Sequence, residues 1–422
     1  MGFWNKFKKI FLIIGFLGLT ILFGYLLWRF FFQSAISPTE PGSETNNLGG
    51  LSPAGEGSGN FASSTGSGRL DSGEDDPDTV KPGGLTTAPT GNEPDALAVG
   101  GKTKTTAVTK NPVLDPTMSN DGQLRYYDRN DGKFYKLDNN GELIALSDKV
   151  FYQVQDVTWS VGGEKAILEY PDGSKISYDF NTKKQVTLPK HWEDFSFSPD
   201  SNKISAKSIG DDIENRWLIV ANADGSRAAS LSAIGKNADD VYPIWSPNNQ
   251  AAAMYTKGVD FDRQEVFFVG LNDENFKSTI INGRGFEPQW SDTGDRLLYS
   301  VYNSDNNMNP SLWIVEAQGD NIGQNRKNLG LNTWASKCTF ATNSEIYCAV
   351  PTELPKGAGL FPELADRTSD NLYKIDLKTG AKKLIALPEN ATNVSSIMVG
   401  EQQEKLYFTD KNNGLIYEIK LK

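Results

Sequence analysis

A short motif recurs along the chain beyond residue 120: an aromatic residue that closes a strand, a polar turn, and an apolar strand. Copies begin at Trp159, Phe197, Trp245 and Trp290, and in weaker form at Phe340 and Val399. Successive copies therefore lie 38, 48, 45, 50 and 59 residues apart. A further strand and turn follow the motif, as in WLIVANADGSRAASL after the second copy. Each repeat thus predicts four short strands separated by turn residues.

A period near 40–45 residues with four strands in each unit indicates a β-propeller. A single four-stranded sheet cannot bury either face alone, whereas sheets stacked around an axis bury both faces against their neighbours. The predicted fold class is therefore all-β. We expect seven blades, with strands in residues 124–137 opening the first and residues 395–421 supplying three strands of the last. Six blades are the alternative, in which N-terminal strands complete the last blade or lie outside the ring.

The repeats resemble those of the TolB-like, WD-repeat-like propeller family, which read W-S-P-D-G-x-x-I-A-F and then L-Y-V-x-D-x-D-G. FSPD from Phe197 and WSPN from Trp245 resemble the first pattern, and ADG from Ala223 resembles the second. The resemblance covers roughly residues 121–422 and implies the fold, since these residues pack blades and form turns. The family includes soluble periplasmic partners of envelope complexes and the propeller halves of certain serine peptidases. This chain departs from the peptidases, because no hydrolase domain and no G-x-S-x-G motif follows its repeats.

Residues 10–28, IFLIIGFLGLTILFGYLLW, form an apolar run of 19 residues without a charge. As a helix this run would span about 28 Å, close to the thickness of a bilayer core. Lys6, Lys8 and Lys9 precede it and Arg29 follows it, which predicts a cytoplasmic N-terminus. We therefore expect residues 1–33 to form a cytoplasmic end and one transmembrane helix that contacts lipid over residues 10–32. A cleaved signal peptide is the alternative, but its apolar region is normally only 7–15 residues long.

Residues 34–110 are rich in Gly, Ser, Thr and Pro and show no hydrophobic periodicity. Such a segment cannot bury enough apolar surface to offset its ordering entropy, so we predict a disordered linker. The predicted organisation is thus an anchor at 1–33, a linker at 34–110 and the propeller at 111–422. This order indicates a single-pass membrane protein whose propeller lies outside the cytoplasm, at the cell envelope.

The formal net charge is -11, of which residues 111–422 carry -10 because residues 1–33 carry +4 and residues 34–110 carry -5. An acidic domain repels phosphate backbones, so nucleic-acid binding is disfavoured and an envelope protein or a cationic polymer is the expected partner. The chain has one histidine, His191, and two cysteines, too few for a four-ligand Cys/His zinc site. Calcium-loop patterns are incomplete. We expect no metal and no cofactor.

Four long connections between second and third strands are predicted to share one face of the ring: residues 209–216, 257–264, 303–310 and 351–370. Their acidic side chains suit a cationic partner. The longest, VPTELPKGAGLFPELADRTSD, also carries apolar side chains that either cap the central channel or dock a partner. The candidate partner-binding residues are Asp211, Asp212, Glu214, Asp260, Asp262, Asp305, Glu353, Leu360, Phe361, Glu363 and Asp366.

Cys338 and Cys348 lie in the hairpin KCTFATNSEIYC. If Phe340 pairs with Ile346, the two cysteines fall opposite each other on one face, close enough for a disulfide. A compartment outside the cytoplasm would preserve that bond. Two separately buried thiols are the alternative.

No catalytic constellation stands out, so we expect a binding or scaffolding module and not an enzyme. The alternative is an envelope lyase or hydrolase that uses paired carboxylates on the face described above. Two carboxylates in a central pocket, one with a raised pKa, would favour that alternative.

Overall fold

The computed structural model describes residues 16, 19–20, 22–23, 25, 93–138 and 141–422 of the chain. The chain divides into two compact units, residues 1–77 and 78–422. In the first unit the described residues are helical. None of the residues that the structure describes forms a helix with the length and apolar character needed to cross a bilayer. The rest of the predicted membrane segment, and the predicted linker up to residue 92, lie outside the described residues.

The second unit is a seven-bladed β-propeller, and the prediction of seven blades is confirmed. Blade 1 comprises β3 (Val113–Met118), β4 (Leu124–Asp128), β5 (Lys133–Leu137) and β6 (Leu143–Ala145). Blade 2 comprises β7 (Asp156–Trp159), β8 (Lys165–Glu169), β9 (Lys175–Asp179) and β10 (Lys184–Leu188). Blade 3 comprises β11 (Trp192–Phe197), β12 (Lys203–Ile209), β13 (Arg216–Asn222) and β14 (Ala229–Ala233).

The remaining blades follow the same antiparallel order. Blade 4 comprises β15 (Val241–Tyr242), β16 (Ala253–Gly258), β17 (Arg263–Val269) and β18 (Thr279–Asn282). Blade 5 comprises β19 (Arg284–Trp290), β20 (Arg296–Tyr302), β21 (Pro310–Glu316) and β22 (Lys327–Asn328). Blade 6 comprises β23 (Cys338–Thr342), β24 (Glu345–Pro351), β25 (Asp370–Asp376) and β26 (Lys382–Pro388), and blade 7 begins with β27 (Val394–Val399), β28 (Lys405–Asp410) and β29 (Ile416–Lys420).

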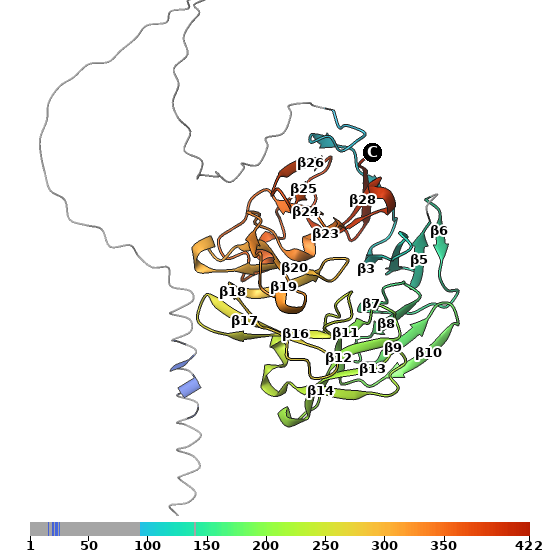
Figure 1. Cartoon of the computed structure of the whole chain (residues 1–422). Helices are drawn as coiled ribbons and strands as arrows, with labels where there is room; N and C mark the ends of the chain where they lie inside the picture. The colour runs from blue at the N-terminus through green and yellow to red at the C-terminus, as the bar shows by residue number, and fades with distance from the viewer. Residues whose placement is uncertain (1–15, 17–18, 21, 24, 26–92, 139–140) are drawn as a thin grey trace, which may run out of the picture. The chain divides into compact units, whose positions relative to one another are not determined.

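The first strand of each blade lies toward the centre of the ring, where strands such as β3, β7 and β27 contact one another (Figure 1). Each first strand runs away from one face, the second strand returns to it, and the third leaves it again. That face therefore carries the starts of the first strands, the connections between second and third strands, and the connections between blades. We call it the top face.

Two short strands from the predicted linker close the ring. β2 (Thr106–Ala107) pairs antiparallel with β29 and supplies the fourth strand of blade 7, while β1 (Lys102–Thr103) pairs parallel with β26 on blade 6. The prediction of a disordered linker up to residue 110 is therefore wrong for residues 93–110, and the propeller begins before residue 111. An N-terminal strand completes the last blade, as the six-blade alternative required, yet the ring has seven blades.

Blade 1 does have a leading strand, β3, which was not predicted from the sequence. Met118 stands where other blades have an aromatic residue, but Ser119 and Asp121 repeat the turn of the better copies. The same turn in blade 3 is stabilised by Ser198. Its buried hydroxyl group donates to Asp200 and accepts the backbone N–H of Lys203. The serine after the motif aromatic is thus a turn residue, which agrees with the turn role predicted for part of the motif.

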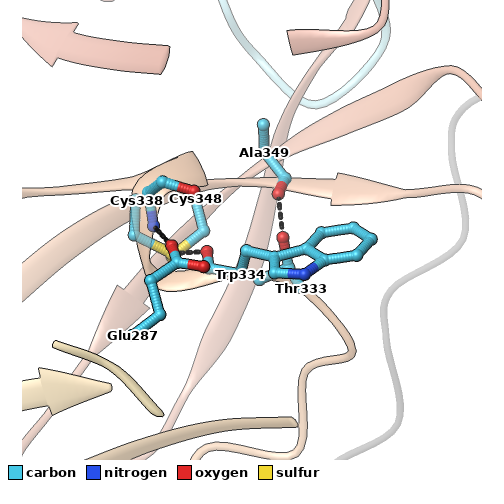
Figure 2. Close-up of a disulfide and its surroundings, with 7 residues drawn as sticks. Glu287, Thr333, Trp334, Cys338, Cys348 and Ala349 are labelled. Carbon is cyan, nitrogen blue, oxygen red and sulfur yellow. Dashed lines mark hydrogen bonds between the residues drawn. A yellow bond between two sulfur atoms is a disulfide. The ribbon is translucent and has the colours of Figure 1, made fainter. Parts of the chain in front are cut away.

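Cys338 and Cys348 form a disulfide, as predicted, and Phe340 pairs with Ile346 in the register that places them opposite each other. Both cysteines are buried between β23 and β24. Figure 2 shows the disulfide beside Thr333 and Trp334, which precede β23. The Thr333 hydroxyl group donates to the backbone oxygen of Ala349 at 2.6 Å, so this stretch is fixed to the neighbouring strand.

Candidate functional site

The top face holds a pocket of about 820 Å³ where blades 7, 1 and 2 meet. The starts of β3, β7 and β27 form its inner wall, and the β28–β29 turn forms another side. Asp115 and Asp156 line it together with Arg129, Lys411 and Trp159. Its volume is in the range of small-molecule sites, which usually combine an apolar surface with a few polar groups. We call it the central pocket.

Asp115 lies at a β-bulge in β3, where the pairing with β4 shifts between Leu114 and Thr117. Its φ angle is 44°, in the left-handed region that a residue other than glycine seldom adopts. Two bonds to blade 2 hold this conformation: the carboxylate accepts the N–H of Val157 at 2.8 Å, and the backbone oxygen accepts the indole N–H of Trp159 at 2.8 Å. Bulges and strained residues of this kind cluster at functional sites.

Burial raises the pKa of Asp115 to about 6, and the like charge of Asp156 adds to the rise, against the N–H of Val157 and the charge of Arg129. Burial also raises the pKa of Asp156, with a contribution from the charge of Asp194. The central pocket thus gathers carboxyl groups whose ionised forms are disfavoured. Neither residue was predicted from the sequence, because β3 lacks the motif aromatic and Asp156 precedes a motif whose residues were predicted to pack blades and form turns.

Replacing Asp115 with Asn is expected to stabilise the protein at neutral pH. The folded-state pKa lies above the unfolded value of 3.8, so ionisation destabilises the fold as pH rises from about 4 to about 6. Asn can still accept the N–H of Val157 and tolerates a positive φ. At pH 7.5 we expect the free energy of unfolding of Asp115→Asn to be about 1–3 kcal/mol higher than that of the wild type. This difference should disappear near pH 4.

Urea unfolding at pH 4, 5.5 and 7.5 measures this difference. Asp148→Asn is the matched control, because the Asp148 side chain is 97% exposed and its replacement should leave stability within about 0.5 kcal/mol at each pH. A wild-type protein more stable than Asp115→Asn at pH 7.5 would show that the fold needs the carboxylate.

The long connection of blade 6, residues 351–370, is an ordered insertion on the top face. Ala358 and Ala365 pack against Trp334 in a small apolar cluster. The N–H groups of Gly357 and Gly359 donate to the backbone oxygens of Asn307 and Met308, in the corresponding connection of blade 5. Gly359 has no room for a side chain, since a Cβ there would lie 2.6 Å from the Cβ of Tyr302. The insertion is therefore fixed to two blades.

Leu360, Phe361 and Leu364 are the exposed large apolar residues of this insertion, with 45%, 53% and 46% of their surfaces exposed. These side chains are exposed to solvent, and their role as a cap of the central channel or as a docking site for a partner stays a prediction. Glu363 lies beside them in the short 3-10 helix η6 (Pro362–Ala365) and is exposed. We call Leu360, Phe361, Glu363 and Leu364 the insertion tip.

A buried charge network fixes the base of the insertion. The ammonium group of Lys337 lies 2.9 Å from Asp370, whose side chain is 0% exposed, and also donates to Asn393 at 3.1 Å. Asp370 accepts the N–H of Val394 at 2.7 Å, and Asn393 donates to the backbone oxygen of Ala365 at 2.9 Å. The network joins blade 6, blade 7 and the insertion. Burial raises the pKa of Asp370, although Lys337 opposes the rise.

The structure divides the predicted acidic residues among several places on the top face. Asp260, Asp262 and Asp305 line one pocket between blades 4 and 5. Asp211, Asp212 and Glu214 are exposed in the connection of blade 3, and Glu353 is exposed in the insertion. Asp366 forms an ion pair with Lys411, at the edge of the central pocket. The connections that carry these acids lie on the top face, and a partner-binding role for the acids stays a prediction.

His191 is exposed, precedes β11 and is not among the residues that line the central pocket. Within the described parts of the chain, no three His, Cys, Asp or Glu side chains are grouped closely enough to hold a metal ion.

No protein-family model matches this sequence, and no curated protein matches it. Solved structures match it in fold. The β-propeller domain of Cps50 (Swd1) from Myceliophteria thermophila shares 11% identity over 75% of this chain and 100% of that chain, with a TM-score of 0.50. Prolyl endopeptidases share 12% identity over 75% of this chain and 49% of theirs, also with a TM-score of 0.50. An oligogalacturonate lyase in complex with manganese shares 13% identity over 75% and 93%, with a TM-score of 0.48.

These similarities show the fold alone. The class of protein that the structure defines is a seven-bladed β-propeller with a top-face insertion, closed by strands from both ends of the propeller sequence. The finer resemblance to TolB-like propellers stays a prediction.

Proposed function

We propose that this protein is a binding module: a propeller held outside the cytoplasm by an N-terminal membrane anchor, which docks a basic segment of an envelope protein on its insertion tip. The observation that carries the proposal is the exposure of three large apolar side chains on one rigid loop. Contacts to two blades fix that loop, so binding would cost little ordering entropy. An exposed apolar group rimmed by polar residues is typical of a protein interaction site.

The chemistry of the partner follows from charge. Residues 111–422 as a whole carry a formal charge of -10, and Glu363 is exposed among the apolar side chains of the insertion tip, although exposed Lys356 and Arg367 balance Glu353 and Glu363 within the insertion itself. A basic partner would be steered toward this face and an acidic one repelled. The anchor rests on the apolar run at residues 10–28 and its flanking lysines, which would keep the propeller close to partners at the membrane.

A second candidate function is favoured by one specific observation in the central pocket. Asp115, with a pKa of about 6, would be largely protonated in mild acid, while the carboxyl group of Asp156 influences it from the same pocket. A protonated acid beside a second carboxyl group is the arrangement that glycosidases use for general acid catalysis. A lyase or hydrolase acting in the central pocket is therefore the alternative to a binding module.

Site-specific photo-crosslinking in cells tests the docking function. A photoreactive residue at position 361 of the full-length protein is expected to capture one discrete partner with a basic surface. The same residue at position 152 is the control, because Tyr152 is 76% exposed and lies in a different blade connection. Leu360→Ser with Leu364→Ser, or Glu353→Lys with Glu363→Lys, should each reduce the crosslinked product about tenfold.

A product of equal intensity from positions 361 and 152, or one indifferent to both pairs of substitutions, would contradict docking at the insertion tip. Turnover of an envelope polysaccharide that is lost in Asp115→Asn would favour the enzymatic alternative instead.

A further inference from the structure

A second top-face pocket, of about 770 Å³, lies between blades 4 and 5. The β16–β17 turn and the β20–β21 connection wall it on one side, and the ends of β18 and β22 close the other. It shares no residue with the insertion tip or with the central pocket. We call it the amide pocket, because asparagine is its commonest lining residue.

The asparagines of this pocket are already oriented by the protein. The side-chain oxygens of Asn303, Asn328 and Asn332 accept bonds from the Asn306 N–H, the Gly330 N–H and the Asn306 amide group at 3.1, 2.7 and 3.2 Å. Each of the three keeps its own NH₂ group without a protein acceptor in the described part of the chain. The amide pocket therefore presents three fixed hydrogen-bond donors that a ligand can use.

Two aromatic rings add flat apolar surfaces. Trp313 is half-buried, its indole N–H donates to the Ser311 hydroxyl group at 3.1 Å, and its ring stacks on Tyr299 with centroids 6.4 Å apart. The indole is thus rigid. Phe261, at the tip of the β16–β17 turn, has 73% of its surface exposed. Aromatic faces of this kind stack against the C–H faces of sugar rings, while oriented amides bond sugar hydroxyl groups.

The charges of the pocket narrow the class of ligand. Asp260 pairs with Arg263 at 2.6 Å, and Asp262 accepts the N–H of Ser304 at 2.9 Å. The exposed carboxylate of Asp305 has no ion pair or hydrogen bond among the described residues, so it remains as an acceptor. The lining side chains comprise three carboxylates and one guanidinium group, and the cationic groups of Arg284 and Lys382 donate to the backbone oxygens of Asp260 and Gly330. Asp305 is thus the lining carboxylate that would meet a ligand without a partner of its own among the described residues, and it disfavours an anionic group there.

We propose that the amide pocket binds a neutral, hydroxyl-rich oligosaccharide. Hydroxyl groups both donate and accept, so they can satisfy the free amide donors and the Asp305 carboxylate at once. The rings of Phe261 and Trp313 supply stacking surfaces, and the unpaired Asp305 carboxylate disfavours acidic sugars. This function goes beyond docking at the insertion tip. Because the two sites share no residue, an experiment can contradict one proposal without contradicting the other.

Titration of the purified full-length protein with oligosaccharides of equal length tests the proposal. The panel comprises neutral hexose oligomers, N-acetylhexosamine oligomers and uronic acid oligomers. At least one neutral series is expected to bind saturably, and the uronic acid series about tenfold more weakly or not at all. Phe261→Ala should raise the Kd about fivefold, and Asn303→Ala with Asn332→Ala by at least as much.

Tyr152→Ala removes an equally exposed aromatic ring elsewhere and should leave the Kd unchanged. Because Phe261 is a surface residue, its replacement should also leave the melting temperature unchanged, which separates lost binding from lost folding. Failure of every neutral series to bind, equal affinity for the uronic acid series, or wild-type affinity in both pocket variants would overturn the proposal. The double variant Leu360→Ser with Leu364→Ser, which should lose the docking crosslink at position 361, should bind the sugar with wild-type affinity.

Discussion

The free energy of unfolding of a chain shortened to residues 111–422 is expected to be about 3–5 kcal/mol lower than that of a chain comprising residues 78–422. The shorter chain lacks β1 and β2, and with them the bonds that join the ring. These include Ala98 to Lys420, Gly100 to Ile385 and Val108 to Ile416, all backbone bonds of 2.8–2.9 Å. Each contributes about 1 kcal/mol net, and the shorter chain also exposes the edges of β26 and β29.

Urea unfolding of the two chains measures the difference, and the shorter chain should also aggregate more readily because its strand edges are open. A chain of residues 93–422 is the control. It retains every strand pairing described here and should match the longer chain. Equal stability of the 111–422 chain would mean that β1 and β2 rest on a ring already closed without them.

Replacing Lys337 with Met is expected to destabilise the protein by about 3–5 kcal/mol at pH 7.5. The substitution leaves Asp370 as an uncompensated carboxylate whose side chain is 0% exposed. Its pKa, already raised by burial, should then rise further. Because the folded-state pKa would lie above the unfolded value, the penalty should shrink as pH falls through that window and Asp370 becomes protonated.

Lys411→Met is the matched control, because Lys411 pairs with Asp366 in an ion pair whose side chains are 48% and 45% exposed. Its loss should cost less than about 1 kcal/mol. Asp370→Asn added to Lys337→Met should recover part of the stability, since an amide oxygen can still accept the N–H of Val394. A Lys337→Met protein within 1 kcal/mol of wild type at pH 7.5 would show that water reaches Asp370.

The blades could be predicted because the strands and turns of each blade are encoded by residues close together in the sequence. Strand, turn and strand follow one another within about 40 residues, and the side chains of a hairpin alternate between two faces. For the same reason the Cys338–Cys348 disulfide followed from one assumed pairing, that of Phe340 with Ile346. The leading strand of blade 1 was missed where local information weakened, at Met118 in place of an aromatic residue.

The sites could not be predicted in the same way, because each is assembled from segments far apart in the chain. Asp115 becomes a strained, buried carboxyl group only when Val157 and Trp159 of the next blade bond to it. The insertion is fixed by contacts to blade 5, and the amide pocket exists only between two blades. The acidic residues of the top face were found by loop length, but their separation into distinct places depends on which blades meet.

What the amino-acid sequence alone determined is the kind of blade, with seven blades favoured over six, since strand periodicity and turn residues act over short distances along the chain. Ring closure was decided by tertiary structure. Residues with the composition of a linker form strands because blades 6 and 7 each present an unpaired strand edge to them. One example is the bond from the Ile416 N–H to the Thr109 hydroxyl group, 307 residues away in the chain. Composition describes what a segment can bury by itself, whereas an unpaired edge supplies hydrogen bonds that the segment does not itself encode.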